Sequence, residues 1–142
     1  MTDLSSLISH LSSLICHLSS VISLLSSMIS PLHSKSYAFA IRIVGCYKYL
    51  SDQKHETVLS KQLLRSGTSI GANTRECKNA QSKLDFLNKL NIALKEADET
   101  DYWLDLLHEA GYLDDMNYDS MHHDCNELIK MLTASVKTLK EK

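Results

Sequence analysis

The stretch Gln62-Leu-Leu-Arg-Ser-Gly-Thr-Ser-Ile-Gly-Ala-Asn73 decides how the helices of this chain can pack. Gly67 and Gly71 are four residues apart, so they lie on one face of a helix, with Ser66 beside them. A glycine inside a helix costs about 1 kcal/mol relative to alanine, and it is usually kept where another backbone approaches closely. We interpret this face as a helix-packing surface. A contact surface for a partner or a nucleic acid is the alternative.

The packing motif continues on a later helical segment. Glu96 and Thr100 lie one turn apart and are placed to reach Arg65 or Asn73 on a neighbouring helix. A buried polar network of this kind fixes the register between two helices. The residues that we assign to helix packing are Ser66, Gly67, Ile70, Gly71, Asn73, Glu96, Thr100 and Trp103.

The spacing of apolar residues predicts an all-α protein, an antiparallel up-down four-helix bundle, with no alternating strand pattern. One proline and four glycines in 142 residues indicate few turns and long helices. Pro31 is expected to stop any preceding helix, with Ser34 as the N-cap of a first helix over residues 35 to 50.

Two sequence signals mark the ends of the third helix, which follows the helix that carries the quoted stretch. Ser82 and Asp85 match a capping box, and Gly111 suits the position just after a C-terminus. A fourth helix carries apolar residues from Met121 to Leu139.

Residues 4 to 30 repeat a seven-residue pattern with three apolar positions. These hold Leu4, Leu11, Leu18 and Leu25; Leu7, Leu14, Val21 and Met28; and Ile8, Ile15, Ile22 and Ile29. The period is that of a coiled coil, and the stripe could self-associate or lie on a membrane surface. Serines dilute it, so we expect no membrane-spanning helix. We therefore divide the chain into a helical or disordered heptad-repeat extension, residues 1–31, and a bundle domain, residues 32–142.

The almost unchanged repetition also suggests a tandem nucleotide repeat read in frame. Our hypothesis is that this leader is dispensable, with Met28 as a candidate native start. An intact mass measured on protein from the native host would test it.

Charge is unevenly distributed along a chain whose formal net charge is only −2. From Lys61 to Lys95 seven basic residues face two acidic ones, whereas Glu96 to Glu127 contains eleven acidic residues and no Lys or Arg. The segregation predicts a basic surface or, alternatively, pairing between neighbouring helices. The candidate phosphate contacts are Lys61, Arg65, Arg75, Lys78 and Lys83.

No catalytic or metal site is predicted. A di-iron bundle needs Glu-x-x-His pairs, and the nearest spacings, Asp105 with His108 and Asp119 with His122, use the shorter acid. Residues 122 to 125 are metal-capable but adjacent, and the histidines among them are interpreted as surface residues. We expect no cofactor. The four scattered cysteines are typical of buried free thiols in a reducing cytoplasm.

Three motifs in order resemble a known family. They are Lys35-Ser-Tyr-x-Phe-Ala40, the segment Lys61 to Asn73 with Glu76, and Ser82-x-x-Asp-Phe86 followed by Lys89 to Leu104. Together they resemble the bacterial four helix bundle protein family, first noted as proteins encoded in intervening sequences of 23S ribosomal RNA genes. The resemblance covers residues 32 to 138, and the heptad leader lies outside it.

The resemblance implies a four-helix protomer that assembles as a homo-oligomeric ring, often a pentamer, with no assigned enzymatic activity. It also implies distant kinship with the accessory proteins of diversity-generating retroelements, which bind nucleic acid and a reverse transcriptase. From residues and resemblance together we expect a cytoplasmic, non-enzymatic oligomer whose basic surface contacts RNA or DNA. A protein-interaction or scaffold ring without a nucleic-acid role is the alternative.

Overall fold

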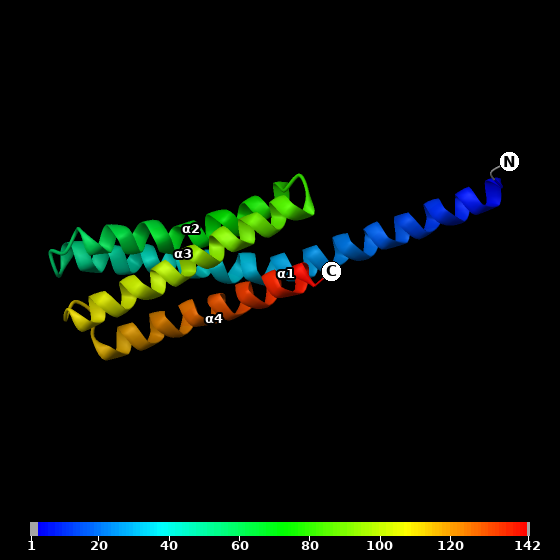
Figure 1. Cartoon of the computed structure of the whole chain (residues 1–142). Helices are drawn as coiled ribbons and strands as arrows, with labels where there is room; N and C mark the ends of the chain where they lie inside the picture. Colours follow the sequence, from blue (N-terminus) through cyan, green and yellow to red (C-terminus); the bar gives the residue numbers. More distant parts are fainter. Residues whose placement is uncertain (1–2, 142) are drawn as a thin grey trace. The chain divides into compact units, whose positions relative to one another are not determined.

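The computed structural model describes residues 3–141, and this part of the chain contains four α-helices, one short 3-10 helix and no strand. The helices are α1 (Leu4–Asp52), α2 (Leu59–Glu76), α3 (Lys83–Glu109) and α4 (Asp115–Lys140), and η1 (Cys77–Asn79) follows α2. Figure 1 shows α2, α3 and α4 running up and down beside one another. The predicted all-α four-helix fold is confirmed.

The chain divides into two units at Pro31. In the unit that ends there, the described residues from Leu4 on are helical, and the heptad side chains Leu4 to Leu18 are each half or more exposed. By length and composition alone, α1 is one helix that could cross a membrane, a test that helices near an N-terminus pass for unrelated reasons. The absence of a membrane role stays a prediction.

The expected helix break at Pro31 is wrong, because α1 continues through this residue and Ser34 is helical, not a cap. A proline removes one N–H donor and its ring crowds the preceding turn. Here the ring is exposed, and the helical turns that follow are held in the bundle by buried residues such as Leu32 and Phe39. One missing hydrogen bond is therefore not enough to end the helix.

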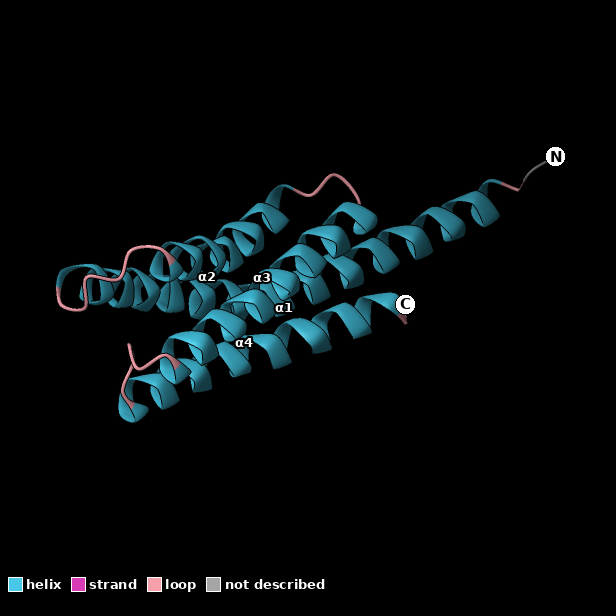
Figure 2. Cartoon of the chain, turned by 60° about the vertical axis from the view of Figure 1, so that its left-hand side comes forward, coloured by secondary structure: helices cyan, strands magenta, loops and turns pink. Residues whose placement is uncertain are grey.

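The bundle closes because each helix packs against its neighbours in sequence and α1 also meets α4. Its largest fully buried side chains come from all four helices and include Phe39, Ile43, Leu63, Ile70, Leu90, Leu104, Leu107, Leu128 and Leu132. At the edge between α1 and α4, Arg42 is hydrogen-bonded to Ser120 and to the Asp124 carboxylate, and Lys35 pairs with Glu127. Figure 2 shows the short links between the helices.

The links around α3 are formed as the sequence predicts. The Asp85 N–H donates to Ser82 Oγ at 3.0 Å, which caps the start of α3. At its end Gly111 has a φ of +81°, and the N–H groups of Gly111 and Tyr112 return to the carbonyls of His108 and Leu107. This is the Schellman arrangement that a glycine permits. It turns the chain directly into α4, whose N-cap is Asp114.

The start of α2 depends on Glu56, which the sequence reasoning missed. Its buried carboxylate accepts hydrogen bonds from the backbone N–H groups of Val58, Leu59 and Ser60 at 2.7–3.0 Å. Burial alone would raise the pKa of Glu56, but these bonds lower it below its ordinary value. A negative charge here also stabilises the positive end of the helix dipole.

Candidate functional site

The structure separates the five predicted phosphate contacts into two groups. Lys61, Arg75, Lys78 and Lys83 are exposed, and none of them forms an ion pair with another described residue. Arg75, Lys78 and Lys83 lie close in sequence around the α2–α3 link, whereas Lys61 is at the opposite end of α2. At 1.5 Å per residue, Lys61 is about 21 Å from Arg75 along the helix axis.

Arg65 differs from the other four because it is bound by α3. Its guanidinium lies 3.4 Å from Glu96 Oε2 and also pairs with Glu99, whose Oε1 accepts from Trp103 Nε1 at 3.1 Å. The hydrogen bond to Glu99 raises the pKa of Arg65, and the bonds from Arg65 and Trp103 lower the pKa of Glu99. The positive charge of Arg65 is thus already compensated within the bundle.

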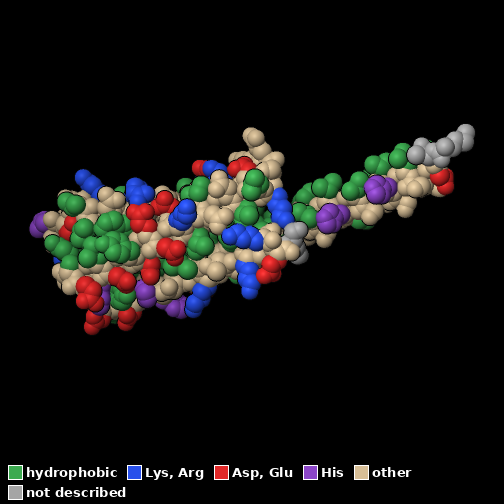
Figure 3. Space-filling view, in the orientation of Figure 1, with side chains coloured by type: hydrophobic (Ala, Val, Ile, Leu, Met, Phe, Trp, Pro, Cys, Tyr) green, Lys and Arg blue, Asp and Glu red, His purple; other side chains and the backbone are tan. Residues whose placement is uncertain are grey.

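A second set of unpaired cations lies at the same end of the bundle as the α2–α3 link. Lys137 and Lys140 are exposed in the last turn of α4, and they have no ion pair among the described residues. In Figure 3, several blue side chains lie at this end, with some red ones beside them, and a larger group of red side chains lies at the far end of the bundle. The bundle therefore has a basic end, defined here as Arg75, Lys78, Lys83, Lys137 and Lys140.

The predicted packing motif lies where α2 meets its two neighbours. A Cβ placed on Gly67 would be 2.7–2.9 Å from three side-chain atoms of Ile43 on α1. At Gly71 the nearest atom would be the Ser36 carbonyl oxygen at 3.4 Å, and Ser36 also bonds Thr74 at 2.9 Å. The two glycines face the same helix, but only Gly67 excludes a side chain on steric grounds.

On the α3 side of the motif, a pair of buried hydroxyl groups joins the two helices. Thr100 Oγ1 donates to Ser66 Oγ at 3.0 Å, and both residues are fully buried. Ile70 is buried as well, whereas Asn73 donates back to the Ser69 carbonyl of its own helix. Glu96 therefore reaches Arg65 and Thr100 reaches Ser66, and Asn73 joins neither.

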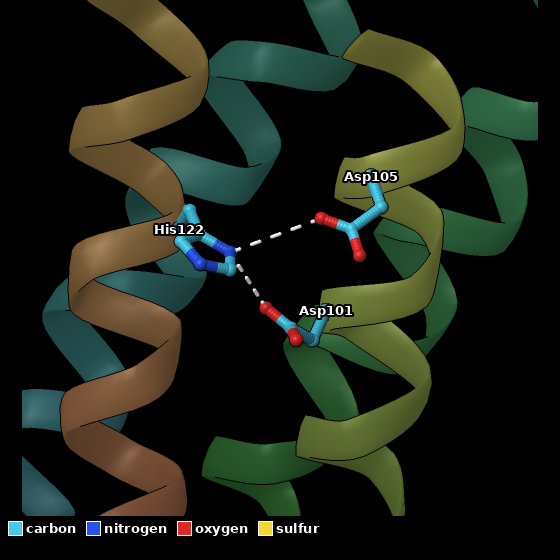
Figure 4. A group of neighbouring side chains, drawn as sticks. All are labelled: Asp101, Asp105 and His122. Carbon is cyan, nitrogen blue, oxygen red and sulfur yellow. Dashed lines mark ion pairs between the residues drawn. The ribbon is translucent and has the colours of Figure 1, made fainter. Parts of the chain in front are cut away.

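A cluster that the sequence reasoning did not assemble lies between α3 and α4 (Figure 4). Asp101 and Asp105 are one turn apart on α3, and His122 of α4 points toward them. His122 Nδ1 is 2.9 Å from Asp101 Oδ1 and 3.9 Å from Asp105 Oδ1. One ligand atom from each of the three residues lies within 4.8 Å of the other two.

Aromatic stacking holds this cluster in place. The Tyr118 ring stacks on His108 with centroids 4.1 Å apart and on His122 at 5.0 Å. The Tyr118 hydroxyl donates to Asp105 Oδ1 at 2.6 Å, which raises the pKa of Tyr118 to about 12. Burial raises the pKa of Asp101 above its ordinary value, and the neighbouring His122 imidazole opposes that rise.

The expectation of surface histidines holds only in part. His123 is exposed, whereas the His122 side chain is 34% exposed and faces α3. Spacing within one helix did not reveal the cluster, because Asp105 joins His122 from another helix. The i, i+4 spacing of Asp101 and Asp105 was the one sign of this cluster in the sequence. Which histidine of α4 lies opposite them depends on the register between α3 and α4, which the sequence does not show.

The cysteines are only partly as expected, because Cys16 is exposed and Cys46 half-buried, whereas Cys77 and Cys125 are buried. Burial raises the pKa of Cys46 and of Cys77 to about 11, and it raises that of Cys125 further. These three thiols stay protonated at neutral pH, so they are poor nucleophiles.

The chain is similar to known proteins over the bundle. A family model described as 23S rRNA-intervening sequence protein matches residues 31–134. A crystal structure of a protein of unknown function from the S23 ribosomal protein family of Bacteroides thetaiotaomicron is 52% identical, with a TM-score of 0.76. The match covers 78% of this chain and 98% of that one. A search of curated proteins finds no match.

Proposed function

Because the chain belongs to the 23S rRNA-intervening sequence protein family, we propose that it is a non-enzymatic, homo-oligomeric bundle protein that binds the backbone of RNA or DNA. The observation that carries the proposal is the basic end, five exposed cations without ion pairs among the described residues. Phosphate contacts from such side chains give affinity and salt dependence without reading base sequence.

The geometry refines the set of contact residues. Arg65 leaves the set, because Glu96 and Glu99 already compensate its charge. Lys61 stays exposed but is too far along α2 to act together with the basic end of a single protomer. Lys137 and Lys140 join the set instead, although they are far from it in sequence.

The test is binding of the full chain to a structured RNA and to duplex DNA across a salt series. A substitution that leaves one phosphate without its cation should reduce the slope of log K against log salt by about 0.9 in magnitude on duplex DNA. Lys78→Ala and Lys83→Ala should each show this reduction. Lys48 lies near the opposite end, is exposed and has no ion pair with the residues that the structure describes. Lys48→Ala and Arg65→Ala should leave the slope unchanged. The proposal fails if nothing binds at low salt or if Lys48→Ala acts like Lys78→Ala.

A protein-interaction ring is the second candidate, and one observation favours it. Tyr37, Ile41 and Val44 form a stripe on α1 at the i, i+4, i+7 spacing, and they are 60%, 58% and 37% exposed. Apolar side chains aligned in this way are typical of a helix that packs against another chain. We propose a second copy of this protein as the occupant, since the same surface on every copy would serve a symmetric assembly.

Light scattering after gel filtration gives the mass of the assembly and tests this candidate. Ile41→Asp should lower the mass, whereas Ile15→Asp, which changes the exposed heptad stripe, should not. If Ile15→Asp lowers the mass and Ile41→Asp does not, the heptad repeat is responsible for assembly. If the parent and both variants have the mass of a monomer, the ring is excluded. The pentameric stoichiometry, the kinship with retroelement accessory proteins, a reverse transcriptase partner and the cytoplasmic location stay predictions.

A further inference from the structure

We propose that Asp101, Asp105 and His122 form a binding site for a divalent transition-metal ion, with zinc as the best-fitting ion, between α3 and α4. The inference is independent of the oligomer and of the basic end. It begins from the convergence in Figure 4, where two carboxylates of one helix and an imidazole of the next point to one volume.

The distances suit such an ion after a small side-chain rotation. Ligand atoms that lie 2.0–2.2 Å from a zinc ion are roughly 3–3.5 Å from one another. The Asp101–His122 separation of 2.9 Å is at the short end of this range, and the Asp105–His122 separation of 3.9 Å is slightly beyond it. Rotation of the half-exposed Asp105 side chain is sufficient to close the triangle.

Asp101 depends on His122 alone for its buried oxygen. The Oδ1 atom lies 2.9 Å from His122 Nδ1, and it has no other polar partner among the described residues. A buried carboxylate oxygen needs a partner of this kind. A cation bound at this point would take the place of the His122 proton and would reduce the repulsion between the negative charges of Asp101 and Asp105.

The remaining nitrogen of His122 has a side-chain amide as its neighbour. Asn126, one turn further along α4, places its amide nitrogen Nδ2 2.8 Å from His122 Nε2. Metal binding requires this amide to turn by 180°, so that its carbonyl oxygen accepts from Nε2–H and the Nδ1 lone pair is directed at the carboxylates. Such a second hydrogen bond fixes the tautomer and orientation of a metal-binding histidine. The stacked Tyr118 ring restricts the same imidazole from its face.

The donor set decides the class of ion. One imidazole nitrogen with two carboxylate oxygens suits zinc and its first-row neighbours, whereas calcium and magnesium prefer oxygen alone. Three protein ligands leave a position for water, which is consistent with side chains that are 26%, 53% and 34% exposed for Asp101, Asp105 and His122.

A second group, His123, Asp124 and Glu127, supplies the matched control. Its ligand atoms are as close together, but Arg42 already pairs with Asp124 and Lys35 with Glu127. A cation there would have to displace a bound side chain from each carboxylate. We therefore expect no zinc at this group.

The experiment titrates the full chain, freed of metal, with Zn²⁺ in a calorimeter. One equivalent should bind per chain with micromolar or tighter affinity. His122→Ala and Asp101→Asn should weaken binding at least tenfold, and Asn126→Ala about tenfold. His123→Ala should leave binding unchanged. Circular dichroism of each variant keeps a loss of folding apart from a loss of ligands.

Co²⁺ as a spectroscopic probe distinguishes this site from the exposed Cys16 thiol. The expected spectrum has weak visible bands and no thiolate charge-transfer band, and it should be the same in Cys16→Ser. The proposal is overturned if Zn²⁺ does not bind at about 100 µM, if His122→Ala binds as well as the parent, or if His123→Ala loses binding equally. Transfer of the cobalt signal to Cys16 would overturn it too.

Discussion

Two surfaces of the bundle contrast in their chemistry: the small-residue surface of α2 and the polar surface that α3 shares with α4. On α2, Ser66 and Gly67 are buried, and they contact α3 and α1 through an uncharged hydroxyl and a missing side chain. Between α3 and α4, titratable groups such as Asp101 and His122 are only partly buried and lie within ion-pair distance. One surface excludes solvent, and the other stays accessible to it.

The contrast indicates where this fold can tolerate change. Close packing fixes the distance between helices, so a small volume error at α2 affects the whole core. A solvated polar cluster contributes little to stability, because water and salt weaken each pair. We therefore expect large stability effects on the α2 surface and small ones at α3–α4, where ligand binding is the property that changes.

The largest effect is expected for Gly67→Ala. The added methyl group would meet Ile43 atoms at 2.7–2.9 Å in a position where Ile43 is fully buried. Overpacking of this kind costs about 1–3 kcal/mol, which outweighs the better helix propensity of alanine. Urea unfolding of the full chain measures the loss.

Gly71→Ala is its matched control. The nearest atom is at 3.4 Å, an ordinary contact, so the gain in helix propensity of up to about 1 kcal/mol should remain. If Gly67→Ala and Gly71→Ala destabilise the protein equally, then the closer contact at Gly67 does not determine the cost of the added methyl group.

The second-largest loss of stability is expected at Glu56, whose carboxylate caps the start of α2. In Glu56→Gln the amide nitrogen cannot accept a hydrogen bond, so one of three capped N–H groups loses its acceptor. We expect a loss of about 1–2 kcal/mol at neutral pH. Urea unfolding at several pH values measures it.

The pH dependence of that loss has a definite sign. The pKa of Glu56 is lowered on folding, so its carboxylate adds stability above the ordinary value of 4.5, and this stability is lost as pH falls through the lowered pKa. The difference between parent and variant should therefore shrink in acid. A difference that stays constant down to acid pH would contradict the capping role.

The helix ends show how much of this fold the sequence alone can predict. Ser82 and Gly111 mark helix ends through their own local chemistry, and the structure places the ends there. Glu56 was missed because it caps α2 from two residues before the N-cap, in a link that folds back so that its N–H bonds the Leu50 carbonyl. Local rules identify residues that stand directly at a helix end better than a residue that caps the helix from further along the link.

The two candidate sites were harder to predict for a different reason. The basic end includes Lys137 and Lys140, and the proposed metal site joins Asp101 to His122, so each depends on which residues of separate helices come to the same level. Sequence periodicity fixes the face of a helix but not its register against a neighbour. The pairing of Arg65 with Glu99, in addition to the expected Glu96, was not predicted for the same reason.

The third effect is expected for Thr100→Val, which removes the buried hydroxyl that bonds Ser66. The cost should be about 1 kcal/mol, since Ser66 Oγ retains only a long contact of 3.4 Å to the Leu63 carbonyl. Adding Ser66→Ala should recover part of this loss, because no unpaired hydroxyl then remains. Strictly additive losses in the double-mutant cycle would show that the two hydroxyl groups are not coupled.

The smallest effect is expected for Tyr118→Phe, which removes a hydroxyl of the α3–α4 surface, as Thr100→Val removes one from the α2 surface. Its bond to Asp105 is short at 2.6 Å, but the Asp105 side chain is 53% exposed, so water can replace the missing donor. The phenylalanine ring should still stack on His108 and His122. We expect a loss below about 0.5 kcal/mol in urea unfolding. If Tyr118→Phe costs as much as Thr100→Val, then the α3–α4 surface holds the fold together as the α2 surface does, and the contrast between them is wrong.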